Sequence, residues 1–222
     1  MELAAKLSKA GAKHGVMVLA IVSAGVPVAL EVAKLLEASL DLIVIRRLLA
    51  PQGPGSQAVA VNVAGTLMMD EEIGPRPAKP ETPLDYFIDD ALKGLSQRVQ
   101  LCRCQLPPAD LAGKSVLIVD CGIRTGLTMH AAIRAVRRLS PVHITVAVPV
   151  TSLEGHRLIE PLVDEFIHLA TPDPFGNVGI WYKDFRRLDD DCISGVLRPG
   201  VKAKSGAGSS SSARINLKAN DD

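Results

Sequence analysis

One segment of the 222-residue chain constrains its fold more than any other, the run from Ser115 to Met129. An apolar stretch ends at Asp120, a loop framed by Gly122 and Gly126 follows, and a helical pattern starts at once. A buried strand of this kind delivers its loop to the carboxyl edge of a sheet, where open α/β folds bind their ligands. Free N–H groups at the start of the next helix, together with the helix dipole, favour an anion there. The segment therefore predicts a phosphate site.

The residue types of this loop suit a sugar phosphate better than a nucleotide. The two glycines allow backbone angles and close ligand approach that a Cβ would obstruct. Thr125 and Thr128 add hydroxyl donors, and Arg124 adds a cation. The nucleotide-loop signatures GxxxxGK[ST] and GxGxxG are both absent from the sequence. We expect Asp120 to accept hydrogen bonds from ribose hydroxyls while the amides beyond it hold the 5′-phosphate.

This segment resembles the phosphoribosyl pyrophosphate motif of the type I phosphoribosyltransferases, an apolar strand followed by two acids and Gly-x-x-Thr-Gly-x-Thr. The resemblance implies that Asp120 takes part in catalysis. Cys121 stands where the family has its second acid, and a thiol accepts hydrogen bonds poorly and brings no negative charge. We therefore expect a weaker grip on the ribose and weaker support of a cationic sugar in the transition state. The residues assigned to ribose phosphate are Asp120, Cys121, Gly122, Ile123, Arg124, Thr125, Gly126, Leu127 and Thr128.

Two earlier segments extend the resemblance. Residues 18–29 are similar to the family's first strand, its pyrophosphate loop and the following helix. Members of this subgroup commonly have a basic residue and paired glycines in that loop, and this chain has neither. Residues 41–47 are similar to the subgroup's next strand, whose two terminal basic residues suit the pyrophosphate or the closing lid. The residues that the resemblance assigns to pyrophosphate are Ser23, Ala24, Gly25, Arg46 and Arg47.

A distal segment also resembles the family. Residues 171–175 and 179–185 look like the carboxyl-terminal segment of this subgroup, which places Phe175 and Trp181 in the expected acceptor pocket. Trp181 is the only tryptophan of the chain, and it could stack on a base or instead fill a hydrophobic gap at the edge of the sheet. The acceptor is left open between a purine, a pyrimidine and some other amine.

Strand and helix patterns alternate along the chain, as is typical of a parallel sheet. Right-handed crossovers then predict a doubly wound α/β fold, a mainly parallel sheet with helices on both faces. Residues 58–63 and 66–69 are expected to form an antiparallel hairpin or edge, and residues 73–83 a mobile loop where the family has its lid. The predicted strands are residues 16–22, 41–46, 116–120, 144–150 and 166–169, and the predicted helices are residues 3–12, 27–38, 84–98, 128–139, 153–162 and 188–197.

Composition sets the remaining expectations. With 47% hydrophobic residues, residues 1–198 are expected to form a single domain, and the Gly- and Ser-rich residues 199–222 a disordered tail. A net charge of +1 argues against a nucleic-acid surface. The apolar stretch 16–30 is interrupted by Ser23, Gly25 and Pro27, which argues against a membrane span. The start of the chain does not resemble a secretory signal, so a cytoplasmic location is expected.

Three hypotheses for function follow. The first is a phosphoribosyltransferase that binds phosphoribosyl pyrophosphate and transfers its sugar to a nitrogen acceptor. The family resemblance then implies magnesium, held mainly through the ligand and water with no direct metal site. The oligomeric state is left open; dimers are frequent in the family, and helix 84–98 is the candidate interface of a homodimer. The second is a regulatory or ligand-binding module that keeps the ribose-phosphate site without catalysis. The third is a general nucleotide-binding α/β domain, which leaves the distal resemblance unexplained.

Overall fold

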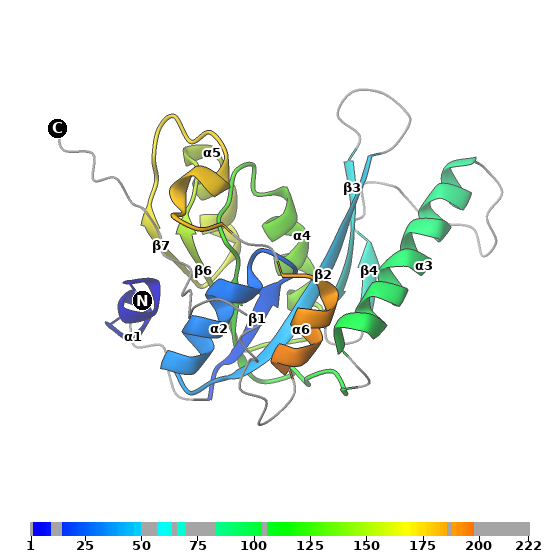
Figure 1. Cartoon of the computed structure of the whole chain (residues 1–222), viewed down its shortest axis with the longest axis horizontal. Helices are drawn as coiled ribbons and strands as arrows, with labels where there is room; N and C mark the ends of the chain where they lie inside the picture. Colours follow the sequence, from blue (N-terminus) through cyan, green and yellow to red (C-terminus); the bar gives the residue numbers. More distant parts are fainter. Residues whose placement is uncertain are drawn as a thin grey trace.

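The molecule is built on one mixed β-sheet (Figure 1). The computed structural model describes residues 2–9, 15–49, 57–63, 66–69, 83–103, 106–185 and 188–197. Within these ranges the sheet has seven strands in the order β4-β3-β2-β1-β5-β6-β7. The strands from β2 to β7 in this order run parallel, while β3 pairs antiparallel with both β2 and β4. The strands are β1 Met17–Ile21, β2 Ser39–Leu49, β3 Gln57–Val63, β4 Thr66–Met69, β5 Ser115–Val119, β6 His143–Val150 and β7 Glu165–Ala170.

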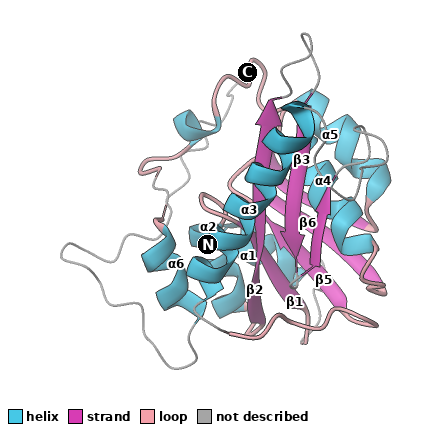
Figure 2. Cartoon of the chain, turned by 90° about the vertical axis from the view of Figure 1, so that its right-hand side faces the viewer, coloured by secondary structure: helices cyan, strands magenta, loops and turns pink. Residues whose placement is uncertain are grey.

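Helices cover both faces of the sheet, and side chains that alternate along each strand divide the core in two. Val18 and Ala20 of β1 face the helices α1, α2, α3 and α6, whereas Leu19 and Ile21 face α4 and α5. Figure 2 shows α2 and α6 to one side of the sheet and α4 and α5 to the other. The helices are α1 Glu2–Lys9, α2 Val26–Leu35, α3 Pro83–Arg103, α4 Leu127–Arg137, α5 Leu153–Ile159 and α6 Asp190–Leu197, with short 3₁₀ turns η2 Glu160–Leu162 and η3 Val178–Trp181.

The direction of winding reverses between β1 and β5. The chain moves outward from β1 through α2 to β2 on one side, and from β5 through α4 to β6 on the other. The loops after β1 and β5 therefore leave adjacent strands and diverge toward opposite faces. In open α/β sheets this reversal point is where ligands bind, because the diverging loops leave a crevice between them.

The observed architecture confirms the predicted α/β fold with a mainly parallel sheet and helices on both faces. The 58–63 and 66–69 hairpin is confirmed as β3 and β4. β2 runs three residues beyond the predicted Arg46 because its distal half pairs with β3 as far as Leu49 opposite Gln57. Residues 10–12 of the first predicted helix, most of the predicted loop 73–83 and the predicted tail 199–222 lie outside the described residues.

A buried ion pair explains why α3 continues past its predicted end at Arg98. Nη2 of Arg103 donates to Oδ1 of Asp41 at 2.7 Å, and both side chains are only 7% exposed. The carboxylate also accepts the backbone N–H of Leu42 at 2.7 Å and that of Ala109 at 2.9 Å. One acid at the start of β2 thus holds the end of α3 and the connection that leads to β5.

A glycine in α3 makes room for an arginine of β2. A Cβ on Gly94 would collide with the guanidinium of Arg46, which lies against this helix. The sequence identifies Gly94 only as a weak point in the helix. The structure shows that its missing side chain makes room for Arg46.

No helix in the described ranges is both long enough and apolar enough to span a bilayer.

We predict that Asp41→Ala lowers the free energy of unfolding by about 3–5 kcal/mol, because it leaves the buried Arg103 guanidinium without its counter-charge. Urea unfolding followed by circular dichroism measures the change. The control is Arg137→Ala, which breaks the exposed ion pair with Asp164 and should cost less than about 1 kcal/mol. Equal losses in the two variants would contradict a structural role for the buried pair.

Candidate functional site

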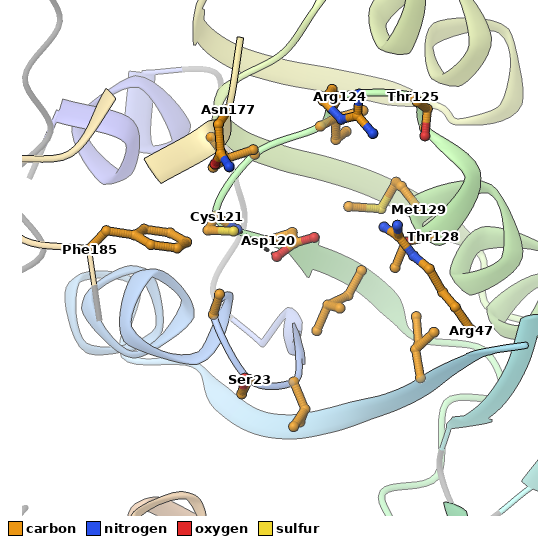
Figure 3. Close-up of a pocket in the computed structure, with 18 of the residues that line it drawn as sticks. Ser23, Arg47, Asp120, Cys121, Arg124, Thr125, Thr128, Met129, Asn177 and Phe185 are labelled. Atoms are coloured by element: carbon orange, nitrogen blue, oxygen red, sulfur yellow. Dashed lines mark hydrogen bonds between the residues drawn. The ribbon is translucent and has the colours of Figure 1, made fainter. Parts of the chain in front are cut away.

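A pocket of about 650 Å³ opens where the loops after β1 and β5 diverge, which is within the range of about 300–1,000 Å³ usual for ligand sites. Its floor comes from the two strand ends, its walls from β2 and α4, and its rim from the segment around Asn177 and Phe185 (Figure 3). The predicted phosphate loop lies in the middle of this arrangement. The sequence-based placement of the site at the carboxyl edge therefore agrees with the pocket.

The phosphate loop is held from behind by the connection between β6 and α5. The N–H of Ile123 donates to the carbonyl of Val150 at 3.0 Å, and the N–H of Ser152 donates to the carbonyl of Ile123 at 2.8 Å. The Ser152 hydroxyl donates to the Arg124 carbonyl and accepts the N–H of Gly155 at 2.9 Å. These bonds use the outer side of the loop and leave its inner side toward the pocket.

The start of α4 is suited to an anion. Gly126 precedes the helix with a positive φ of 82°, a conformation that costs other residues strain, and no side chain caps the helix. The first N–H groups of α4 have no partner within the helix, and the dipole adds partial positive charge at this end. A phosphate in the loop would satisfy these donors.

An arginine from β2 reaches the same helix start. Nε of Arg47 donates to Oγ1 of Thr128 at 2.8 Å, and Nη2 donates to it at 2.5 Å. Figure 3 shows the Arg47 guanidinium beside Thr128. Because the hydroxyl accepts from the arginine, its own hydrogen is available to a phosphate oxygen. The pair thus presents a cation and a hydroxyl donor together.

Asp120 lies near the centre of the pocket, between the phosphate loop and the loop after β1 (Figure 3). Burial raises the pKa of its carboxyl to about 6, against the hydrogen bond from the Cys121 N–H at 2.7 Å and the charge of Arg47, both of which lower the pKa. The group is therefore largely ionised at neutral pH and loses its charge in mild acid. As a carboxylate it can accept hydrogen bonds from neighbouring sugar hydroxyls.

Cys121 is locked in place by the carboxyl-terminal segment. Its carbonyl accepts the Tyr182 hydroxyl at 2.5 Å, and both residues are 8% exposed. Burial and the neighbouring Cys121 and Asp120 raise the pKa of Tyr182, so its hydroxyl stays protonated and keeps donating. The segment that the sequence matched to the family therefore fixes the backbone at the position of the missing second acid.

A close approach joins the two loops. A Cβ on Gly25 would lie 2.6 Å from the Ile21 carbonyl oxygen and 3.0 Å from the Cα of Asp120. Glycine at this position lets the loop after β1 lie directly against the loop after β5. The Val22–Ser23 peptide bond in the same loop is cis.

The structure brings most of the predicted site residues together. Of the predicted phosphate-loop residues all but Leu127 line the pocket, and Ser23, Ala24 and Arg47 line it as well. Gly25 is not among the lining residues and packs against Asp120. Leu127 is 40% exposed at the start of α4.

Three predicted residues lie elsewhere. Arg46 points to the opposite face of β2 from Arg47, as the alternation of a strand requires, and lies against Gly94. Phe175 is buried, and its carbonyl accepts the Trp181 indole N–H at 2.9 Å. Neither Phe175 nor Trp181 is among the residues that line the pocket.

Several pocket residues were not predicted. Phe185 and Asn177 contribute to the rim, and Ile45 and Met129 supply apolar wall. Phe185 belongs to the 179–185 segment that resembles the family, so this resemblance could have identified it as a site residue. Arg98 of α3 lies in a helix distant in sequence from every motif, and nothing in the sequence pointed to it.

Magnesium fits the site as an ion that arrives with its ligand. In the part of the chain that the structure describes, no three His, Cys, Asp or Glu side chains gather as a metal site. Mg²⁺ commonly keeps several waters and binds through substrate phosphates and one or two carboxylates. Asp120 is the carboxylate among the residues that line the pocket, which is enough for that mode of binding.

The sequence of the chain matches a known family model. The phosphoribosyl transferase domain model matches residues 1–167, well over half of the chain. The chain therefore belongs to the phosphoribosyl transferase domain family. This confirms the resemblance drawn from the motif.

Individual relatives extend the match. The Mycobacterium tuberculosis proteins named "Putative phosphoribosyl transferase Rv0571c" (strain H37Rv) and "Putative phosphoribosyl transferase MT0597" (strain CDC 1551) are each 32% identical over 196 residues, 88% of this chain and 44% of theirs. The chain thus spans less than half the length of these curated relatives. The crystal structure of TT1426 from Thermus thermophilus has a TM-score of 0.72 at 28% identity and covers 88% of this chain and 92% of its own.

We predict that Gly25→Ala lowers affinity for ribose 5-phosphate by about tenfold or more, because the added Cβ displaces the loop after β1 from Asp120. Isothermal titration calorimetry measures the affinity. Gly195→Ala in α6, where a Cβ meets nothing within 4 Å, is the matched control and should bind normally. Unchanged binding in Gly25→Ala would contradict the role of this contact.

We predict that ribose 5-phosphate binds the protein more weakly as the pH falls from about 7.5 to about 5, because Asp120 gains a proton near pH 6. The phosphate group of the ligand titrates in the same range. Asp120→Asn isolates the contribution of the side chain, since its pH profile keeps only the ligand's own titration. Superimposable profiles for the two proteins would contradict the assignment.

Proposed function

We propose that the protein binds phosphoribosyl pyrophosphate with magnesium and transfers its phosphoribosyl group to a nitrogen acceptor, releasing pyrophosphate. The observation that carries the proposal is the position of Asp120 beside an uncapped helix start that also holds Arg47 and Thr128. This arrangement offers a hydroxyl acceptor at one end and phosphate donors at the other. A ribose 5-phosphate group satisfies both ends with one ligand.

The transfer forms a bond between the acceptor nitrogen and C1 of the ribose while the bond from C1 to the diphosphate oxygen breaks. The leaving pyrophosphate takes the electron pair, and the nitrogen then loses its proton. Mg²⁺ bound together with the ligand would offset the negative charge of the diphosphate oxygens. The chain contributes position and electrostatics, with the phosphate loop fixing the 5′ end and the ionised Asp120 stabilising positive charge on the sugar.

The apolar side of the pocket suits a planar acceptor. Phe185 lies beside Cys121 at the rim, and Asn177 adds an amide that can donate and accept (Figure 3). These residues take the place of Phe175 and Trp181, which lie outside the pocket lining. We propose that the acceptor enters past Phe185 and Asn177.

A second candidate function rests on Cys121. The position of the second acid holds a thiol, and the Tyr182 hydrogen bond fixes the backbone there. With one carboxylate in place of two, the site can hold a ribose phosphate as a regulatory or binding module without catalysing transfer. The two functions differ in turnover, and both use the ribose-phosphate site.

The first experiment is calorimetric titration with phosphoribosyl pyrophosphate, with and without Mg²⁺, beside ribose 5-phosphate. Magnesium-dependent binding of phosphoribosyl pyrophosphate supports the transferase function. An acceptor screen then uses pyrophosphate release as its readout. Binding of ribose 5-phosphate alone supports the binding module. Binding of neither compound would overturn both.

We predict that Cys121→Asp separates the two functions. In a binding module, the restored acid creates pyrophosphate release that the natural chain lacks. In a transferase, it changes an existing rate without creating a new one. In whichever protein releases pyrophosphate, Asp120→Asn should abolish that activity, whereas Arg137→Ala, on the far part of α4, should leave it intact. Equal effects of these two variants would contradict the assignment.

A further inference from the structure

We propose that Arg98 of α3 is the cation that binds the diphosphate of phosphoribosyl pyrophosphate, and that Asp190 of α6 holds it in place until the ligand arrives. The inference rests on the proposed function. It assigns a role to a residue that belongs to no sequence motif. It also divides the pocket's arginines between two ends of one ligand.

Arg98 and Arg47 approach the pocket from opposite faces of the sheet. Neighbours of Arg98 in α3, including Leu95 and Cys102, belong to the core shared with α2 and α6. Ala24 and Phe185, which line the pocket with Arg98, pack against that same core. Arg98 therefore reaches the side of the pocket formed by the loop after β1.

Arg47 serves the other side. It lies two residues after Ile45 and so on the same face of β2, which packs against the core shared with α4. Its guanidinium is hydrogen-bonded to Thr128 at the start of that helix. Arg124 is part of the phosphate loop itself. These two cations are placed for the 5′-phosphate.

The side of the loop after β1 lacks charge of its own. Ser23, Ala24 and Gly25 offer a hydroxyl and backbone N–H groups but no cation. Gly25 precedes α2 with no side-chain cap, so this helix start also presents free N–H groups. A diphosphate with several negative charges needs a counter-charge here, and among the lining residues Arg98 is the cation that shares this side.

The pairing of Arg98 with Asp190 suits an exchange of partners. Nε donates to the two carboxylate oxygens at 3.1 and 3.3 Å, and Nη2 donates to Oδ1 at 3.0 Å. Both side chains are about one-third exposed, at 36% and 30%, and such a solvent-screened pair is weak. A guanidinium has a third nitrogen with two more donors. Arg98 therefore has donors left for a phosphate oxygen and can release Asp190 at little cost when the ligand arrives.

The ion pair between Arg98 and Asp190 also places the proposed diphosphate site close to the carboxyl-terminal segment. α6 lies beside α3 (Figure 1), and the chain between η3 and α6 carries Tyr182 and Phe185. A diphosphate bound by Arg98 thus lies next to the segment that fixes Cys121.

The test compares two ligands in two variants. We predict that Arg98→Gln weakens phosphoribosyl pyrophosphate binding by about tenfold or more and leaves ribose 5-phosphate, which lacks the diphosphate, within about twofold. Arg47→Gln should weaken both ligands. Asp190→Asn is the matched control, because it breaks the same ion pair but keeps the guanidinium, and it should keep or increase affinity for phosphoribosyl pyrophosphate.

Each result decides the proposal. If Asp190→Asn and Arg98→Gln lose affinity equally, Arg98 only joins α3 to α6, and the proposal is overturned. Unchanged binding in Arg98→Gln, or equal loss for both ligands, overturns it as well. Should Arg98→Gln fail to fold, Arg98→Lys keeps the charge without the planar fork, and it should retain part of the selective affinity. A natural chain that binds ribose 5-phosphate but not phosphoribosyl pyrophosphate would instead refute the transferase itself.

Discussion

The contact between the loops after β1 and β5 is the constraint on which the site depends. These loops leave neighbouring parallel strands and turn to opposite faces, so they would separate if Gly25 carried a side chain against Asp120. The missing Cβ keeps a helix start, a loop of backbone amides and one carboxylate within the reach of a single small ligand. Without this contact the two halves of the pocket would hold their groups apart.

Charge in the pocket is arranged around that contact. Asp120 lines the pocket together with two arginines that arrive from the two faces of the sheet, Arg47 beside α4 and Arg98 beside α6. Burial alone would favour a neutral carboxyl, and the hydrogen bond from the Cys121 N–H together with the charge of Arg47 partly offsets this rise in the pKa. This balance keeps the group largely ionised at neutral pH, the form that would accept hydrogen bonds from the proposed sugar ligand. The buried Asp41 and Arg103 pair supports the arrangement at the other end of the sheet, where it holds α3 in register with β2.

Local patterns predicted the fold and the phosphate loop, because both depend on order along the chain. The β5 segment carries its own strand, acid, glycines and helix start, so a single window identifies it. Local patterns could not predict the roles of residues that depend on partners distant in the sequence. The alternation along β2 could have separated Arg46 from Arg47, but which of the two faces the pocket is decided by the register with β1 and β3. Trp181 was predicted to lie in the acceptor pocket because it is the only tryptophan of the chain and belongs to the segment that resembles the family. In the structure its indole N–H donates to the Phe175 carbonyl, and Phe185 lines the pocket instead. The position of Arg98 in the pocket depends on how α3 packs against the sheet, which the sequence of α3 alone does not reveal.

The central claim is that Asp120 and the phosphate loop hold the two ends of one ribose phosphate. The most direct measurement compares the affinity of the natural chain and of Asp120→Asn for ribose 5-phosphate and for 2-deoxyribose 5-phosphate, which has one hydroxyl fewer for the carboxylate. The account predicts that the natural chain prefers the ribose form by about tenfold, the energy of a charge-assisted hydrogen bond, and that Asp120→Asn loses most of this preference. Equal affinity of the natural chain for the two sugars, or the same preference in both proteins, would contradict it.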